Sequence, residues 1–135
     1  DNKQEVNNFL QEFLSLNLYK DTISVAPDNK KLAYLNNNEL AVFWIENQEF
    51  EPIRKKSDSQ LVVRFSTPIA GFFWTKDSEH LVYSAGQKIF VTELDQRGGV
   101  NSFEVLALKP EQKLVFLKNK EIFIEEGKQI FSVKF

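Results

Sequence analysis

The first apolar residues of the chain recur with the spacing of one face of an α-helix. They stand at positions i, i+3, i+4, i+7 and i+8: Val6, Phe9, Leu10, Phe13 and Leu14. Asn2 followed by Glu5 resembles a capping box at the start of such a helix. We therefore predict an amphipathic helix over residues 3–15, packed on the end of the domain. A helix that binds a partner or lies on a membrane stays open, although Lys3 is the one basic residue of its polar face.

After Asp21 the pattern changes to short runs rich in β-branched and aromatic residues. Turn residues such as Pro27-Asp28-Asn29 and Gly98-Gly99 separate these runs, which is typical of an antiparallel meander. From Leu40 to Ile45 both alternating sets are apolar, so we expect this strand to be covered on both faces. The eleven predicted strands are residues 23–26, 31–35, 40–45, 61–66, 69–74, 80–84, 88–93, 102–108, 114–117, 121–125 and 129–135.

An internal repeat runs through these strands. A leucine followed two positions later by an aromatic residue occurs at Leu32, Leu81 and Leu114. In each copy an aliphatic residue stands eight positions after that leucine, at Leu40, Ile89 and Ile122. The leucines are 49 and 33 residues apart, so the copies differ in length outside this shared part. The longer interval holds the polar stretch 46–60, where we expect a loop.

Each repeat unit needs a fourth strand to complete a small twisted sheet. Residues 61–66 are the candidate in the first unit and residues 129–135 in the third, which begins with 102–108. The second unit has only a weak candidate, between Asp95 and Asn101. Four-stranded sheets that repeat every 40–50 residues or so stack around an axis in β-propellers. We therefore predict an all-β fold of β-propeller type, with a helix and linker at 1–20 and about three four-stranded antiparallel blades at 21–66, 67–101 and 102–135.

Residues 25–34, Val-Ala-Pro-Asp-Asn-Lys-Lys-Leu-Ala-Tyr, resemble the S-P-D-G-K-x-L-A-Y signature of WD40-like and TolB-type propeller blades. Ala26 and Asn29 replace the usual serine and glycine. Asparagine tolerates a left-handed backbone, so we expect the turn to be kept. The copy at 75–83 matches more loosely, and the copy at 108–116 is one residue shorter.

Residues 61–95 are similar to the propeller regions that follow PEGA domains in bacterial envelope proteins. The resemblance to propeller repeats covers about residues 21–135. It implies a scaffold used for binding in the cell envelope, and none of the catalytic motifs of propeller enzymes maps onto it. Three blades cannot close a ring, because known propellers have four to eight. We therefore expect a part of a longer propeller, self-association with other copies, or an open stack whose first edge the helix caps.

The composition excludes several kinds of function and of site. The 135 residues carry a net charge of −2, which gives no long-range attraction for nucleic acid or an anionic membrane. The absence of cysteine excludes disulfides, thiolate nucleophiles and cysteine-ligated metals. No apolar run approaches the roughly 20 residues of a membrane-spanning helix. Because the chain begins at Asp1 and contains no methionine, we expect a trimmed or partial chain, and an upstream signal or anchor stays open.

Two aspartates occupy equivalent positions in the repeat. Asp28 and Asp77 could supply oxygens to calcium, but no D-x-D-x-D spacing surrounds either, and calcium takes six or more oxygens. We expect both to be turn residues whose side chains bond their own backbone. His80, the one histidine, stands at the strand start where the other copies have Lys31 and Lys113. We expect these positions to be exposed, and no nucleophile motif accompanies His80 for catalysis.

Arg54-Lys55-Lys56, with Arg64 nearby, is the one basic cluster. It could contact phosphate or an acidic partner, but glutamates 46, 49 and 51 flank it, and we expect it to solubilise the loop. Residues 95–99, Asp-Gln-Arg-Gly-Gly, are expected to form a turn, since a phosphate loop ends in Lys-Ser/Thr before a helix. Trp44, Trp74 and the phenylalanines could include a sugar-stacking platform, although most are needed in the core.

These observations favour a non-enzymatic protein-interaction or scaffold module, with no cofactor, catalytic residue or metal site assigned. We expect a protein partner, no nucleic acid and no membrane insertion by this segment. Two alternatives stay open: a carbohydrate- or cell-wall-binding module, and an accessory propeller of a hydrolase whose catalytic domain lies outside this chain. Residues 1–135 contain no G-x-S-x-G motif of such a hydrolase.

Overall fold

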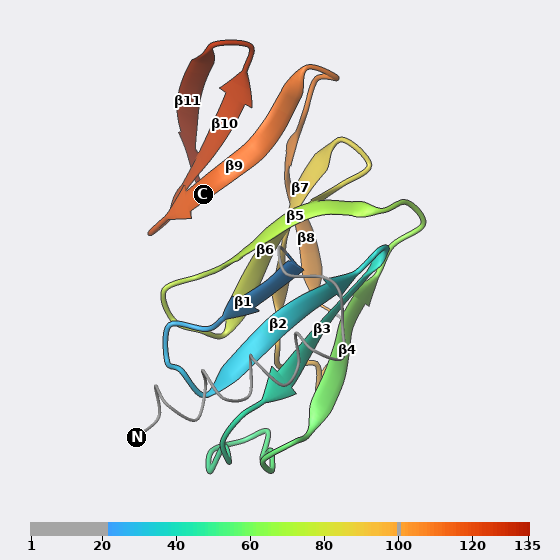
Figure 1. Cartoon of the computed structure of the whole chain (residues 1–135), viewed down its shortest axis with the longest axis vertical. Helices are drawn as coiled ribbons and strands as arrows, with labels where there is room; N and C mark the ends of the chain where they lie inside the picture. Colours follow the sequence, from blue (N-terminus) through green and yellow to red (C-terminus); the bar gives the residue numbers. More distant parts are fainter. Residues whose placement is uncertain (1–21, 100) are drawn as a thin grey trace.

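The computed structural model describes residues 22–99 and 101–135, which form eleven strands (Figure 1). Each predicted strand is present, and its ends differ from the prediction by at most two residues. The helix predicted over 3–15 lies outside the described residues. The strands are β1 (Ile23–Val25), β2 (Lys31–Asn36), β3 (Glu39–Trp44), β4 (Ser59–Arg64), β5 (Ile69–Trp74), β6 (His80–Ala85), β7 (Lys88–Glu93), β8 (Ser102–Ala107), β9 (Gln112–Lys118), β10 (Glu121–Glu126) and β11 (Gln129–Lys134).

The strands form three separate antiparallel sheets, so the all-β prediction is confirmed. The first sheet has the order β1-β2-β3-β4, the second β5-β6-β7-β8 and the third β11-β10-β9. Within each sheet, strands that are adjacent in space are therefore also consecutive in sequence, as a meander requires.

The third sheet has three strands, where four were predicted. The strand at 102–107, β8, pairs with β7 in the second sheet, so its assignment to the third unit is wrong. The weak candidate for that place forms a turn instead, in which the Gly99 N–H donates to the Gln96 carbonyl at 2.9 Å. The free edge of β7 is taken by the next extended run, in which Leu106 pairs with the buried Ile89.

The eight-residue spacing of the repeat arises because the central hairpins of the three sheets share one register. In each sheet the hairpin closes on a two-residue turn, after the pairs Asn36–Glu39, Ala85–Lys88 and Lys118–Glu121. Gly86 and Gln87 have φ of 58° and 60°, the two left-handed residues of a type I′ turn. The turn before β2 holds Asn29 at φ 58°, as predicted, and the matching turn before β6 holds Ser78 at φ 61°.

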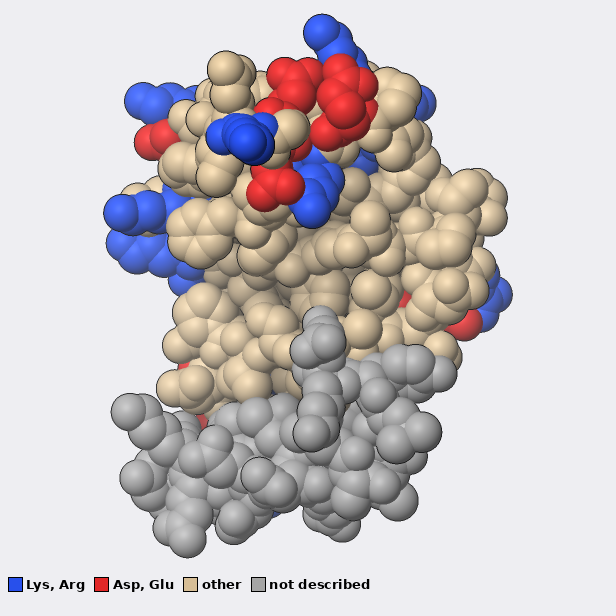
Figure 2. Space-filling model, turned by 45° about the horizontal axis from the view of Figure 1, so that its top comes forward, with Lys and Arg blue, Asp and Glu red and all other residues tan. Residues whose placement is uncertain are grey.

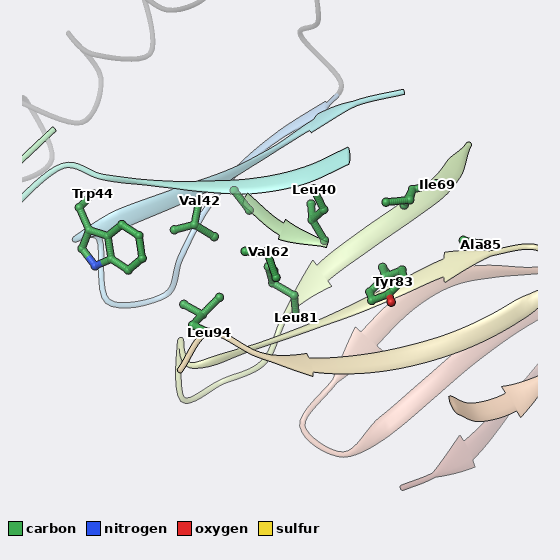
Figure 3. Packing of buried hydrophobic residues seen from close by; sticks show 10 residues of the cluster. Leu40, Val42, Trp44, Val62, Ile69, Leu81, Tyr83, Ala85 and Leu94 are labelled. Atoms are coloured by element: carbon green, nitrogen blue, oxygen red, sulfur yellow. The ribbon is translucent and has the colours of Figure 1, made fainter. Parts of the chain in front are cut away.

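The largest core cluster lies between the first and second sheets (Figure 3). Leu40, Val42 and Trp44 of β3 pack there against the opposing Leu81 and Tyr83 of β6. A second cluster joins the other face of the second sheet to the third sheet; its buried members are Val82, Ile89, Leu108, Ile122 and Ile124. The middle sheet is therefore covered on both faces. β3 is also apolar on both faces, as predicted. Ala41 is buried on the face opposite Leu40, Val42 and Trp44, and Ile45, just after the strand, is buried as well.

Directed polar bonds join the first two sheets around this core. The Trp74 indole N–H donates to the Ser24 carbonyl at 2.8 Å, and the Asp28 N–H donates to the Ser78 hydroxyl at 3.0 Å. The Gln60 side chain of β4 donates to the carbonyl of Leu94, just after β7, at 2.9 Å. Because such bonds need a defined geometry, they fix how the two sheets lie on each other.

Candidate functional site

The most structured surface feature outside the sheets is the loop between β3 and β4, residues 46–58, which we call the 46–58 loop. Its base is closed by two backbone bonds of 2.9 Å between the ends, Trp44 N–H to Asp58 O and Ser57 N–H to Trp44 O. Within it, Gln48 and Arg54 exchange backbone bonds of 2.8 and 3.2 Å. The loop is therefore a long hairpin connection that is held by its own backbone hydrogen bonds, with residues 49–53 at its tip.

Side chains anchor this loop to the core. The buried Gln48 accepts a bond of 3.1 Å from the Trp44 indole N–H and donates one of 2.7 Å to the Pro52 carbonyl. The Arg54 guanidinium lies 4.7 Å from the centre of the Trp44 ring, in a cation–π contact, and donates to the Gln60 side chain. These contacts hold the tip in one conformation.

The tip exposes two large apolar side chains, Phe50 and Ile53. Their exposed fractions are 57% and 53%. Beside them lies a hollow of about 320 Å³ whose walls include Asn47, Ile53 and Lys55. Exposed apolar patches mark interaction sites on soluble proteins, and these two side chains, three residues apart at the tip, are candidates for the centre of such a patch. Phe50 and Ile53 were not among the residues predicted to be functional; the available signal was two large apolar residues inside a polar loop.

The predicted basic cluster is divided between different surroundings. Arg54 is half-buried against Trp44, while Lys55 and Lys56 are exposed on the loop, as expected of solubilising residues. Arg64 lies at the far end of β4 and forms a 3.0 Å ion pair with Glu39. The face in Figure 2 likewise carries basic and acidic side chains side by side at its upper end. The cluster therefore does not form one continuous basic patch.

The aspartates of the repeat are turn residues, as predicted. Asp28 accepts a bond of 2.9 Å from the Lys30 N–H, and Asp77 accepts one of 2.8 Å from the Glu79 N–H. Within the described ranges, no three His, Cys, Asp or Glu side chains lie together as a metal site would require.

His80 lies partly exposed between two carboxylates. Its Nδ1 is 3.0 Å from Asp77 and its Nε2 is 3.7 Å from Glu93. Burial alone would raise the pKa of Asp77, but bonds from Thr75 and the Glu79 N–H, together with His80, hold that pKa below its usual range. Asp77 and His80 border an open hollow of about 510 Å³ between the second and third sheets, with the apolar Val91 and Phe135 on its walls. Of the described residues on those walls, Thr75 alone carries a hydroxyl group, and it lies 3.0 Å from the His80 carbonyl to which it donates.

Lys31, at the position equivalent to His80, is buried, so the expectation of an exposed side chain there is wrong. Its ammonium group lies 2.8 Å from Asp28 and 3.6 Å from Glu79 of the second sheet. The cause is the stacking of the first two sheets, which brings the turns before β2 and β6 together. Lys113, the third equivalent, is exposed as expected and pairs with Glu125 at 3.2 Å.

Residues 95–99 form a turn, as predicted. Asp95 accepts two bonds from the Arg97 guanidinium, at 2.9 and 2.7 Å. These bonds hold the pKa of Asp95 at about 2. Since Arg97 is already engaged by a carboxylate, the turn offers no free positive charge to a phosphate.

Both tryptophans, candidates for a sugar-stacking platform, take part in the contact between the first two sheets. Trp44 is buried in the first core cluster, and the Trp74 indole is bonded to the first sheet. Across the part of the chain that the structure describes, no helix is long and apolar enough to cross a membrane. No family model matches the chain, and no curated protein matches it.

Proposed function

We propose that this chain is a non-enzymatic protein-interaction module and that the tip of the 46–58 loop is its contact surface. The observation that carries the proposal is the exposure of Phe50 and Ile53 on a loop that Trp44, Gln48 and Arg54 hold in place. Aromatic side chains, phenylalanine among them, are enriched in protein interfaces relative to the rest of the surface. A loop that is already ordered loses little conformational entropy on binding.

We also propose that the three sheets are blades of a propeller-type repeat protein of the WD40-like or TolB-type kind. The common hairpin register, the left-handed Asn29 and Ser78, and the face-to-face packing of successive sheets support this proposal. Further blades, or other copies of the chain, would have to complete a ring. The proposed place in the bacterial cell envelope depends on the sequence resemblance alone.

The experiment is affinity capture from a native envelope lysate with three proteins: the wild type, a Phe50→Ala/Ile53→Ala double variant, and Leu61→Ala as matched control. Leu61 is a large apolar residue that is exposed on β4, outside the loop. We expect the wild type and the control to recover one protein in stoichiometric amount and the double variant to lose it. Equal recovery by all three proteins would exclude the loop tip.

A glycan array distinguishes the carbohydrate-binding alternative. Specific glycan binding, together with repeated failure to recover a protein, would replace the proposed function by that alternative. Circular dichroism and thermal unfolding of the double variant should match the wild type, because both side chains are already exposed.

A further inference from the structure

The three sheets have six edge strands, and five of them carry a feature that hinders further pairing. β1 has only three residues. β4, β5, β8 and β9 each have a register shift against their partner, with one extra residue: Val62, Ala70, Val105 and Val115, respectively. Short edge strands and β-bulges are two means by which proteins prevent edge-to-edge association.

β11 is the exception. Its six residues pair with β10 in one unbroken register, from Gln129 to Lys134, and it contains no proline or glycine. No other described strand pairs with its outer side. Along that side, every second residue of an edge strand presents unpaired N–H and C=O groups, which are a template for another strand.

The core interface next to this edge is also incomplete. The register places Phe131 opposite Ile124 on β10, so Phe131 points toward the second sheet, yet it is 38% exposed. Phe103 of β8 pairs with Val91 and faces the same interface, yet it is 59% exposed. At the opposite edge of the third sheet, β9 lies against β5 and β6. The two sheets are thus in contact through β9 and β10, while Phe103 of β8 and Phe131 of β11 stay partly uncovered at the other end of the interface.

We propose that β11 binds an extended segment of a partner protein as the fourth strand of the third sheet. Its inward side chains, at alternate positions, would be apolar and would cover Phe103 and Phe131. β11 and the turn before it carry Lys128 and Lys134 and no acidic residue, so acidic residues at the ends of the segment complement this edge. A second copy of β11 would bring more positive charge instead. This surface is separate from the 46–58 loop and does not depend on it.

The test uses a soluble probe, the capped peptide Glu-Val-Thr-Val-Thr-Val-Glu, and amide hydrogen exchange of the whole chain measured by NMR. At about ten times its Kd, the peptide should slow exchange about tenfold at the β11 amides that are not bonded to β10. The amides of β4 and β8 should not change. The same peptide with proline in place of its central valine is the control and should give no protection, because proline interrupts the added ladder.

Charge exchange tests the second part of the proposal. Lys128→Glu/Lys134→Glu should weaken binding of the Glu-ended peptide roughly two- to fivefold for each exposed pair, and a Lys-ended peptide should recover it. The Phe50→Ala/Ile53→Ala variant should bind the peptide like the wild type, so that failure of either surface can be recognised independently.

Three results would overturn the proposal. The first is no protection of β11 at a peptide concentration of about 1 mM, where even weak strand addition is populated. The second is protection confined to another edge strand. The third is protection of β11 that grows with protein concentration without peptide, which would identify the occupant as a second copy of this chain.

Discussion

At the residue scale, burial separates positions that the repeat makes equivalent. Lys31 is 1% exposed and bridges two turns, whereas Lys113 is exposed on the third sheet. The carboxylates of Asp28 and Glu79 remain partly exposed to water. The buried ammonium group of Lys31 therefore has two negative charges beside it. Burial raises the pKa of Glu79, because desolvation outweighs the attraction of Lys31.

We predict that Lys31→Ala lowers the free energy of unfolding by about 1–3 kcal/mol. The variant leaves Asp28 and Glu79 without their shared cation and removes the packed stem of the lysine. Lys113→Ala is the matched control and should cost less than about 0.5 kcal/mol, since its ion pair is exposed. Urea denaturation measures both values. Equal losses in the two variants would contradict the bridging role of Lys31.

A second prediction at this scale concerns acid. Since the folded state lowers the pKa of Asp77, the ionised carboxylate contributes stability above its usual pKa of 3.8, and this contribution is lost as the pH falls through the folded value. Asp77→Asn should therefore reduce the fall in stability between about pH 5 and pH 2, by less than about 1 kcal/mol because Asp77 is largely exposed. Thermal unfolding at several pH values measures this, and an NMR midpoint of Asp77 at or above 3.8 would refute it.

At the scale of elements, the hairpin turns carry the conformational demands of the fold. Gly86 and Gly127 both have φ of 58°, a region in which a side chain is strained. Their surroundings differ. A Cβ at Gly86 would lie 3.3 Å from the Phe65 ring, whereas nothing lies within 4 Å at Gly127. Phe65 in turn packs against Phe90, with ring centres 5.3 Å apart, so it is part of the contact between the first two sheets.

We predict that Gly127→Ala costs about 1 kcal/mol and Gly86→Ala about 2 kcal/mol in the free energy of unfolding. Both variants place a side chain on a strained left-handed backbone, but only Gly86→Ala must also displace Phe65. Chemical denaturation of the two variants gives the comparison. A cost at Gly127 equal to or above that at Gly86 would show that the Phe65 contact adds nothing.

At the scale of the whole molecule, the three sheets do not contribute equally to stability. The second sheet is covered on both faces, and β6 is buried from Leu81 to Ala85. The third sheet is held through one face, by a smaller cluster that includes Ile122 and Ile124, and β11 is exposed along most of its length. Segments with few buried contacts open at lower free energy than the core.

We predict that Ile122→Ala lowers amide protection in β9–β11 while β2, β3 and β6 keep theirs. Leu81→Ala, a truncation of similar size in the shared core, should lower protection throughout. Each variant should lose about 2–5 kcal/mol in the region that it affects. Hydrogen exchange followed by mass spectrometry resolves the two patterns. A uniform loss in Ile122→Ala would mean that the three sheets unfold as a single unit.

Much of the local structure was predictable because it depends on neighbouring residues. Alternating β-branched and aromatic residues produced all eleven strands, and Asn29 occupies the left-handed position expected of it. Asp28 and Asp77 bond their own turns, which needs no more than the residues around them. The candidate surface was less accessible to this reasoning, because the exposure of Phe50 and Ile53 depends on how Gln48 and Arg54 anchor the loop to Trp44.

The amino-acid sequence by itself determined where the strands run, where the chain turns and which hairpin register recurs, since these features follow from side-chain size, alternation and backbone preference over a few residues. Only the tertiary structure decided that β8 completes the second sheet, that Lys31 is buried while Lys113 is exposed, and that no other described strand pairs with the outer side of the regular β11. Pairing and burial depend on which free edge or face lies nearest in space, and segments far apart in the chain compete for it.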